Sequence, residues 1–378
     1  MSNVKIAFVY DLVYPFSVGG NEKRLHCIAQ SLSEKHEVHV FGMKSWRGAP
    51  ERMQGKVFLH GISDAPQNLY SENGRRKILP SLAFAFRLFF ALLKTDFDVL
   101  ECQSFPFLPL LSCRLACMLK CKTLAVYWVE AWHDYWNEYL GAAGFFGKAV
   151  ERFCTRLSPY NLANSAHTKR RLVSLLGMKP EKIRIISPAV CVPESFPRPA
   201  TSFDVVFAGR LIAHKNPGLL VEAIAIASRK MPGISLAIIG SGPEKENVQG
   251  TAEMLGLQKN IAFFENLPEQ LLFSIVANAK VFVLPSEREG FGMSCLEAMH
   301  FGVPVLTLDS PLNAAKELVG EKELVCKKDA KELAGKIVFL LSHERERKML
   351  GEKLREKSKA FSMRIVLAEY EDFFAGLR

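Results

Sequence analysis

The chain has 378 residues, of which 49% are hydrophobic and 23% are charged, and its formal net charge is +10. This length predicts two or three domains with sizeable cores, and this composition is ordinary for a globular protein and excludes a disordered one. The charge excess lies entirely in the first half: residues 1–198 contain 26 Lys and Arg against 16 Asp and Glu, whereas residues 199–378 contain 23 of each kind.

The uneven charge predicts that the first half faces an anionic partner, either a membrane surface or an acidic acceptor. Nucleic acid is the competing partner. We do not expect it, because the basic residues form only short clusters and the chain has neither zinc-finger spacing nor an aromatic ribonucleoprotein motif.

Hydrophobic stretches alternate with helical patterns along the first half, which predicts an α/β fold. The first strand begins close to Met1 and is soon followed by Asp11, so neither a signal peptide nor a stop-transfer segment fits. We therefore expect a cytoplasmic chain. Strands are expected over residues 5–10, 37–42, 99–101, 123–129, 161–164 and 183–187, with helices between them.

Residues 79–93 are nearly apolar all round, but these 15 residues are fewer than the ~20 that a bilayer span needs. We expect a buried helix between strands. The alternative is that part of this segment, together with Arg75, Arg76 and Lys77, dips into a membrane surface.

Two patterns in this half contain the residue types that bind metals, but we expect each to have a structural role. The triplet Asp-Phe-Asp at 96–98 is formally a metal-binding D-x-D, yet it directly precedes a strand, which favours a helix-to-strand turn. Cys113, Cys117 and Cys121 recur every four residues, which places them along one helix face as small buried side chains.

Four prolines between residues 188 and 199 can continue neither a helix nor a central strand, so this segment is expected to be a linker. We expect an N-terminal domain of residues 1–198 and a C-terminal domain of residues 199–360. Two doubly wound parallel sheets would then face a central cleft lined by the loops at the carboxyl ends of their strands. The second sheet is expected to contain strands over residues 204–208, 235–239, 261–264, 281–284 and 305–308.

The most specific feature is a glycine loop between the strand at 281–284 and a helix that begins near Cys295. Such a junction binds anions, because Gly290 and Gly292 let backbone N–H groups approach a ligand and the helix N-terminus is positive. Glu289 and Glu297 would repel a phosphate, so each makes sense only as an acceptor of hydrogen bonds from sugar hydroxyls. The ligand implied is a nucleotide diphosphate sugar.

This Glu-Gly-Phe-Gly loop, with a second Glu eight residues after the first, resembles the donor signature of retaining glycosyltransferase family 4. Members of that family have the GT-B architecture of two Rossmann-like doubly wound domains. The resemblance implies that Glu289 contacts the transferred sugar, that Glu297 holds the nucleotide ribose, and that Gly290, Phe291 and Gly292 form the donor loop between them. It also implies that a C-terminal helix, residues 361–378, packs back on the first domain.

The same resemblance assigns a second donor site to the loop after the strand at 204–208. Gly209 and Arg210, followed by Lys215, match the family residues that bind the donor diphosphate. The physical need is clear, since the leaving group departs with growing negative charge and cations that stabilise it accelerate the step. The turn at 240–243, Gly-Ser-Gly-Pro, matches a family turn and is expected to supply backbone geometry.

Two loops of the first half complete the resemblance. Gly19 and Gly20 resemble the glycine loop that approaches the donor phosphates, with a plain turn as the alternative. Relatives carry a catalytic His at the end of the strand predicted at 123–129, and His133 is our candidate, with Glu130 as the substitute. The alternative is that His133 packs among the neighbouring aromatic side chains.

We therefore expect a cytoplasmic enzyme, peripheral on the inner face of the membrane, that moves a hexose from a UDP- or GDP-linked donor to an acceptor hydroxyl with retention. The acceptor is expected to be a glycan or a lipid-linked saccharide, and no metal or other cofactor is expected. The alternatives are a nucleotide-sugar-binding protein without turnover and another GT-B activity, such as sugar-phosphate or glucan synthesis.

Overall fold

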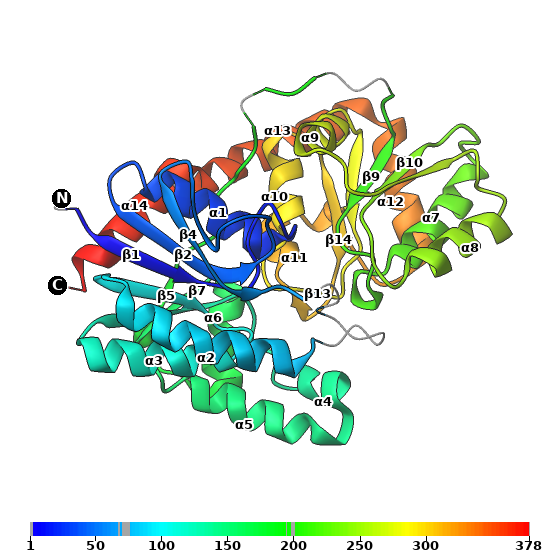
Figure 1. Cartoon of the computed structure of the whole chain (residues 1–378). Helices are drawn as coiled ribbons and strands as arrows, with labels where there is room; N and C mark the ends of the chain where they lie inside the picture. The colour runs from blue at the N-terminus through cyan, green and yellow to red at the C-terminus, as the bar shows by residue number, and fades with distance from the viewer. Residues whose placement is uncertain (1–2, 67–68, 70–75, 194, 198–200, 378) are drawn as a thin grey trace. The chain divides into compact units, whose positions relative to one another are not determined.

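The computed structural model describes residues 3–66, 69, 76–193, 195–197 and 201–377. It consists of two compact units (Figure 1). Unit 1 comprises Met1–Ala189 and Met363–Arg378, and unit 2 comprises Val190–Ser362. The division after Ala189 precedes the predicted boundary at residue 198, because the proline-rich segment is fixed on unit 2. There, Ser274 Oγ donates a hydrogen bond to the Pro197 carbonyl, and the Phe196 ring packs 5.4 Å from Phe301.

Unit 1 is built on an eight-stranded sheet with the order β3-β4-β2-β1-β5-β6-β7-β8. All neighbouring strands are parallel except β3, which is antiparallel to β4. The predicted strands are present, and the hairpin of β3 and β4 is an addition that the sequence pattern did not indicate. The strands are β1 (Lys5–Val9), β2 (Glu37–Lys44), β3 (Glu51–Gln54), β4 (Val57–Asp64), β5 (Val99–Gln103), β6 (Thr123–Trp128), β7 (Tyr160–Ala163) and β8 (Ile183–Ile185).

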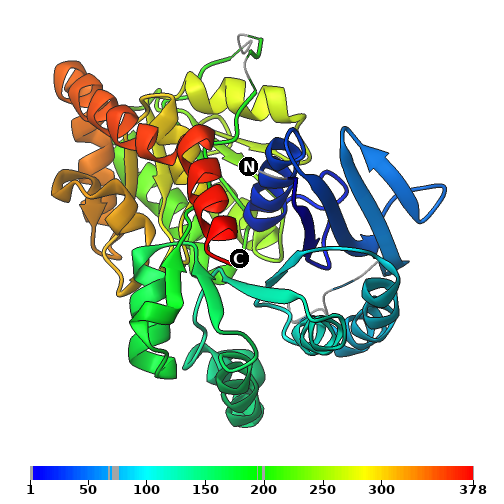
Figure 2. The ribbon, with the colours of Figure 1, turned by 90° about the vertical axis from the view of Figure 1, so that its left-hand side faces the viewer.

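Helices cover both faces of this sheet (Figure 2). Successive residues of β1 point to opposite cores, Ile6 and Phe8 to one and Ala7 and Val9 to the other, so the strand is apolar throughout rather than alternating. The first core contains α1 (Gly20–Leu32) and α14 (Met363–Ala375). The second contains α2 (Ile78–Lys94), α3 (Leu108–Lys120), α4 (Tyr135–Leu140), α5 (Gly144–Cys154) and α6 (Ala166–Leu176).

The C-terminal helix α14 is held in unit 1 by a buried polar network. The Arg24 guanidinium donates to Glu101 Oε1 from both nitrogens, at 3.2 and 3.1 Å, and also to the Tyr370 hydroxyl. Tyr370 in turn donates to Glu101 Oε2 at 2.9 Å. The helix begins at Met363, and Phe361, predicted as part of this segment, packs in the core of unit 2 instead.

Replacing Tyr370 by Phe is expected to lower the free energy of unfolding of unit 1 by roughly 1.5–3 kcal/mol, because buried hydrogen bonds to charged groups are lost. The measurement is urea unfolding of the wild type and of Tyr370→Phe. The phenyl ring keeps the packing of α14, so an unchanged midpoint would show that the hydroxyl adds no stability.

Helix α2 differs from the prediction, which was a buried helix. Phe84, Leu88 and Leu92 are buried against the sheet, but Leu79 is 78% exposed and Phe86 is 69% exposed. The apolar pattern runs all round this helix, and only its inner side has the sheet to pack against. In the membrane alternative, the part given to Arg76 needs correction, since Arg76 is buried in an ion pair with Asp11. Arg75 lies outside the described residues.

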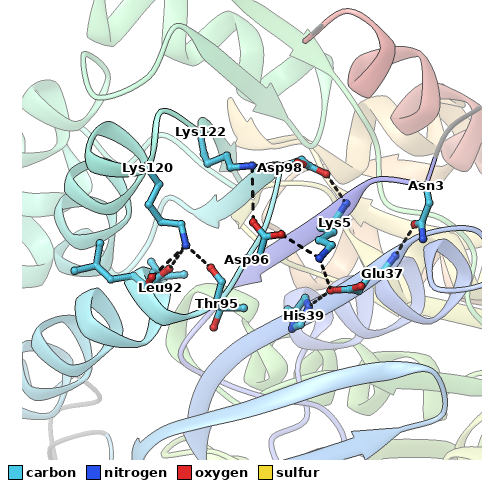
Figure 3. Close-up of polar contacts among 11 residues, drawn as sticks. Asn3, Lys5, Glu37, His39, Leu92, Thr95, Asp96, Asp98, Lys120 and Lys122 are labelled. Atoms are coloured by element: carbon cyan, nitrogen blue, oxygen red, sulfur yellow. Dashed lines mark hydrogen bonds and ion pairs between the residues drawn. The ribbon is translucent and has the colours of Figure 1, made fainter.

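The D-x-D triplet forms the turn between α2 and β5, as predicted (Figure 3). Asp96 accepts a hydrogen bond from Lys5 Nζ at 3.0 Å, and Asp98 accepts from the Lys5 amide at 2.9 Å and from Lys122 Nζ at 3.2 Å. These contacts join the amino ends of three neighbouring strands, β1, β5 and β6. The carboxylates therefore lie at the edge of the sheet opposite the strand carboxyl ends. Of the predicted buried cysteines, Cys113 and Cys117 are buried in α3, whereas Cys121 follows the helix and is exposed.

Unit 2 is built on a six-stranded parallel sheet with the order β11-β10-β9-β12-β14-β16. A separate pair of two-residue strands, β13 (Arg288–Glu289) and β15 (Leu312–Asn313), was not predicted. The main strands are β9 (Val205–Ala208), β10 (Leu236–Ile239), β11 (Ile261–Phe264), β12 (Val281–Leu284), β14 (Val305–Leu308) and β16 (Val325–Cys326). The helices are α7 (Pro217–Ser228), α8 (Lys245–Met254), α9 (Glu269–Ala277), α10 (Met293–His300), α11 (Ala315–Val319), α12 (Ala330–Ser342) and α13 (Glu344–Ser358).

Candidate active site

An ion pair between Lys215 and Glu289 lies at the carboxyl ends of β9 and β12. Lys215 Nζ is 2.6 Å from Glu289 Oε1, and the side chains are only 15% and 13% exposed. Ser286 Oγ donates to the same carboxylate oxygen at 2.9 Å. Burial alone would raise the pKa of the Glu289 carboxyl, but the charge of Lys215 and the hydrogen bonds from Lys215 and Ser286 outweigh it, so the pKa is lowered. Glu289 is therefore an ionised carboxylate in a largely enclosed place.

Hydrogen bonds to backbone carbonyls tie the two loops that carry this pair. The Glu287 amide, on the loop after β12, donates to the His214 carbonyl, on the loop after β9, at 2.8 Å. Asn216 Nδ2 donates to the Pro285 carbonyl at 3.1 Å. The Ala314 amide donates to the Glu289 carbonyl at 2.9 Å and extends the pairing of β13 with β15. The separation of Lys215 from Glu289 is thus fixed by main-chain contacts and not by the side chains alone.

The glycine turn after β10 supports the loop that holds Arg210. The Leu211 amide donates to the Ser241 carbonyl at 2.8 Å. Gly240 has φ +147°, and a Cβ placed on it would overlap the Gly209 carbonyl oxygen. A Cβ on Gly242 would likewise overlap the Leu211 carbonyl. The turn therefore packs backbone against backbone, which is the structural role that its sequence predicted.

Three cationic side chains lie close enough to His214 to affect the pKa of its imidazole. Burial lowers the pKa of its imidazole to about 4, and the charges of Lys215, Arg288 and Arg210 lower it further, while Glu289 acts in the opposite direction. His214 is therefore neutral at pH 7. Arg288, which belongs to none of the sequence motifs, is only 7% exposed and directly precedes Glu289. The charged groups with the largest effect on His214 are thus mainly cationic, and an excess of positive charge favours binding of an anion.

Helix α10 adds its N-terminus to the same place. Gly292 is its N-cap with φ +100°, a conformation that favours glycine, so the first-turn amides follow directly on the glycine loop. The Phe291 side chain is buried and packs 5.5 Å from Phe361, so any contact of this residue with a ligand would come from its backbone.

The second carboxylate of the motif, Glu297, is also enclosed, with 9% exposure on α10. Burial raises the pKa of the Cys295 thiol well above its ordinary value, and the charges of Glu289 and Glu297 raise it further. Both carboxylates therefore lie near the same buried thiol, and neither side chain is exposed to solvent.

In unit 1, Gly19 and Gly20 form the start of α1, at the carboxyl end of β1. Gly19 is the N-cap, and the Glu22 carboxylate of the first turn lies directly against it. A side chain at position 19 would displace this carboxylate. The Glu22 carboxylate thus occupies the space beside Gly19. It is also near the buried carboxylate of Asp11, which forms an ion pair with Arg76 at 2.7 Å.

His133 follows β6 at the same edge of the unit 1 sheet, on the loop that also carries Glu130. Its backbone has φ +38°, and its ring pairs with Asp134 at 3.0 Å. Trp132 stacks on Phe105 and packs against Trp136, whereas the His133 side chain is 29% exposed. These contacts disfavour the alternative in which the ring is part of the aromatic packing.

Glu151 on α5 holds this loop in place, a role that no sequence motif predicted. Its carboxylate accepts hydrogen bonds from the Trp132 amide at 2.7 Å, the His133 amide at 2.9 Å and Trp136 Nε1 at 2.9 Å. The signal in the sequence was a Glu at an inward position of an amphipathic helix. Among the residues that the structure describes, this loop included, no group of three or more His, Cys, Asp or Glu side chains is arranged to hold a metal ion.

Comparison with known families matches almost the whole chain. The model of Glycosyltransferase Family 4 matches residues 18–192, and that of Glycosyl transferases group 1 matches residues 192–357. The chain belongs to glycosyltransferase family 4. The loops that carry Gly19, Gly20 and His133 therefore lie within the first match of this glycosyltransferase, and the ion pair and the glycine loop lie within the second.

Solved structures agree in fold with this glycosyltransferase. A sucrose-phosphate synthase of Thermosynechococcus elongatus matches with a TM-score of 0.80 and 17% identity over 98% of each chain. The HepE protein of Anabaena, in complex with UDP and glucose, matches with a TM-score of 0.76 and 17% identity over 99% of this chain and 100% of that one. These likenesses show the GT-B fold of two parallel-sheet Rossmann-like domains.

Curated relatives match over shorter stretches. An exopolysaccharide phosphotransferase of Streptomyces coelicolor is 30% identical over 217 residues, which cover 56% of this chain and 22% of the relative. A GDP-mannose-dependent phosphatidylinositol monomannoside mannosyltransferase of Mycolicibacterium smegmatis is 35% identical over 109 residues, 27% of this chain and 28% of the relative. The glycosyltransferase thus spans less than two thirds of these relatives.

The predicted site residues fall into two groups. Those brought together at the strand carboxyl ends of unit 2 are Gly209, Arg210, Lys215, Glu289, Gly290, Phe291, Gly292 and Glu297. Those at the strand carboxyl ends of unit 1 are Gly19, Gly20 and His133. In both units this is the edge where open parallel sheets bind their ligands.

Proposed function

We propose that this glycosyltransferase moves a hexose from a nucleotide diphosphate sugar to an acceptor hydroxyl with retention of configuration. The observation that carries the proposal is the enclosed pair of Lys215 and Glu289 inside a cluster of cations. Before the donor binds, the two side chains neutralise each other. A diphosphate offers the Lys215 ammonium a better partner, and the sugar hydroxyls offer hydrogen bonds to the Glu289 carboxylate that is then released.

The same residues account for the chemical step. The bond between the anomeric carbon and the diphosphate oxygen breaks, the acceptor oxygen forms the new bond to that carbon, and the proton of the acceptor hydroxyl passes to the departing diphosphate. Negative charge grows on the departing diphosphate, where Arg210 and Lys215 and the amides at the start of α10 stabilise it. We assign no enzyme nucleophile. We also assign no metal, because Arg210, Lys215 and the amides of α10 supply the positive charge. The measurement that checks this is the transfer rate in excess EDTA, which should be unchanged. The roles of Gly19, Gly20, His133 and Glu297 stay predictions from the resemblance.

The identity of the donor is supported from two directions. The Anabaena structure holds UDP and glucose, and the mycobacterial relative is named as dependent on GDP-mannose. We therefore propose a UDP- or GDP-linked hexose. The relatives are named for exopolysaccharide and phosphatidylinositol substrates, which supports a glycan or lipid-linked acceptor reached at the inner face of a membrane.

A thermal-shift panel of UDP, GDP, ADP and their sugars tests the donor, because a ligand that binds only the folded protein raises its melting temperature. One nucleotide diphosphate is expected to stabilise the protein, and its sugar to be hydrolysed or transferred. If no nucleotide diphosphate raises the melting temperature, the proposal fails. If the donor binds but never turns over, the chain is a nucleotide-sugar-binding protein instead.

The pKa of His214 is expected to rise from about 4 when the nucleoside diphosphate found by that panel binds. The added negative charge favours the imidazolium and offsets the neighbouring cations. The measurement is an NMR pH titration of the His214 ring proton, assigned by comparison with His214→Gln. His300, whose pKa is lowered by burial and Arg355, is the internal control and should not respond. An unchanged pKa of His214 would place the diphosphate elsewhere.

A further inference from the structure

An unusually apolar surface lies on the outer side of three helices of unit 1, α2, α3 and α5. Thirteen of the 21 large apolar side chains that are exposed among the described residues belong to these helices, so the exposure is concentrated and not scattered. The members are Ile78, Leu79, Leu82, Phe86 and Phe90 on α2, Leu111, Leu115, Met118 and Leu119 on α3, and Phe145, Phe146, Val150 and Phe153 on α5. We call this surface the apolar face.

The exposed residues form regular stripes. On α2 they recur at positions 79, 82, 86 and 90, and on α3 at 111, 115 and 118, which is the spacing of one helix side. The two helices are joined through their inner sides, where Ser112 Oγ donates to the Ala85 carbonyl at 2.6 Å. All three helices contribute to the core on one face of the sheet, and Figures 1 and 2 place them along the same side of unit 1. Their outer sides therefore turn away from the sheet together.

Helix α2 shows why this face calls for an apolar environment. Its inner side is buried in the protein core, and its outer side is also mainly apolar, with Arg87 and Lys94 as its exposed charged residues. None of the helices that the structure describes is long and apolar enough to cross a bilayer. A helix of this kind can lie in the interface of a bilayer with its outer side among the lipids.

The charges on the same helices identify the partner. Their sequences contain six basic residues, namely Arg87, Lys94, Arg114, Lys120, Lys148 and Arg152. They contain one acidic residue, Glu151, which is fully buried and bonded within the loop at 132–136. Lys148 is paired with Asp134 at 2.9 Å, and Lys120 donates to three backbone carbonyls, so the excess positive charge comes from the other four basic residues. An apolar surface with an excess of positive charge matches an anionic lipid surface, with headgroups at the rim and acyl chains below.

We infer that the apolar face docks on an anionic phospholipid bilayer, which deepens the proposed function by placing its lipid-linked acceptor beside the enzyme. A second copy of the chain fits less well. Two such faces would bring the positive charge of one copy, from Arg87, Lys94, Arg114 and Arg152, against that of the other, and like charges in an interface oppose association.

Vesicle sedimentation tests this inference without any donor or acceptor, so its outcome is independent of the transfer reaction. The wild type is expected to bind vesicles of phosphatidylcholine with phosphatidylglycerol at low salt, and to bind vesicles of phosphatidylcholine alone more weakly. Phe86→Ser with Phe153→Ser should weaken binding by roughly tenfold for each ring removed from lipid. Arg87→Glu with Arg152→Glu should weaken it by at least about fivefold per charge, and added salt should act in the same direction.

Met254→Ser with Met349→Ser is the matched control, since these methionines of unit 2 are 81% and 63% exposed but lie outside the apolar face. This variant should bind vesicles like the wild type. Wild-type protein that ignores anionic vesicles at low salt would overturn the inference, as would equal binding by the phenylalanine variant. A dimer in solution that Phe86→Ser dissociates would assign the face to a second copy. Nucleotide thermal shifts measured on the same variants show that unit 2 is intact.

Discussion

Replacing Lys215 by Ala is expected to lower kcat by about 10²- to 10³-fold, the usual cost of removing one donor that stabilises charge in a transition state. The residue is enclosed at the carboxyl ends of β9 and β12, where its ammonium is 2.6 Å from Glu289. In the proposed reaction it also faces the departing diphosphate. The measurement is the initial rate of transfer or donor hydrolysis at saturating donor, with the donor that the thermal-shift panel selects.

A lower rate in Lys215→Ala could come from lost stability of the folded site and not from lost stabilisation of the leaving group. Lys215→Ala leaves the Glu289 carboxylate without its counterion, and breaking a buried pair is destabilising in itself. In the double variant Lys215→Ala with Glu289→Gln, the neutral amide needs no counterion. We expect this variant to recover most of the lost melting temperature and none of the lost rate.

The control is Lys280→Ala. The Lys280 side chain is 53% exposed, and its Nζ is 2.8 Å from the Asp204 carboxylate. Exposed ion pairs add little stability, so this variant should keep both rate and melting temperature. If the double variant regained activity, Lys215 would be a counterion for Glu289 and no more. If Lys215→Ala kept its rate, the proposed leaving-group site would be wrong.

The central strands were predictable because burial on both faces leaves a strong mark in the sequence. β11, β12 and β14 have the predicted bounds, and each is a short apolar run followed by a loop. The hairpin of β3 and β4 was not predictable in the same way. Glu51, Arg52 and Met53 are exposed at the edge of the sheet, so the sequence there has no continuous apolar run.

The site was predictable as a set of residues but not as an arrangement. Motifs marked Lys215 and Glu289 separately, and 74 positions separate them in the chain, so their pairing depends on the packing of β9 beside β12. Arg288 and Glu151 belong to no motif, and their roles follow from burial next to a particular loop. The exposure of the outer side of α2 was not predictable either, because a helix that is apolar all round does not indicate which of its sides the protein covers.

Replacing Gly240 by Ala is expected to lower the free energy of unfolding of unit 2 by roughly 2–4 kcal/mol, because a Cβ would overlap the Gly209 carbonyl and because the residue has φ +147°. Backbone hydrogen bonds oppose a shift of the loop that contains Gly209. The Gly209 amide donates to the Ile239 carbonyl at 3.0 Å, and the Leu211 amide donates to the Ser241 carbonyl at 2.8 Å. Urea unfolding of the wild type and of Gly240→Ala measures the change.

The same substitution should also reduce kcat/KM by about 10²-fold, because the displaced loop carries Arg210 and a misplacement of about 1 Å can have this cost. Gly250→Ala is the matched control. Gly250 lies inside α8, where a Cβ would meet nothing within 4 Å, so this change should stabilise the helix by about 0.5–1 kcal/mol and leave the rate unchanged. If Gly240→Ala and Gly250→Ala had the same stability and the same rate, the close packing of the turn on its neighbouring loop would contribute to neither. A stable Gly240→Ala variant with a full rate would likewise show that Arg210 does not depend on the contact between the turn and its loop.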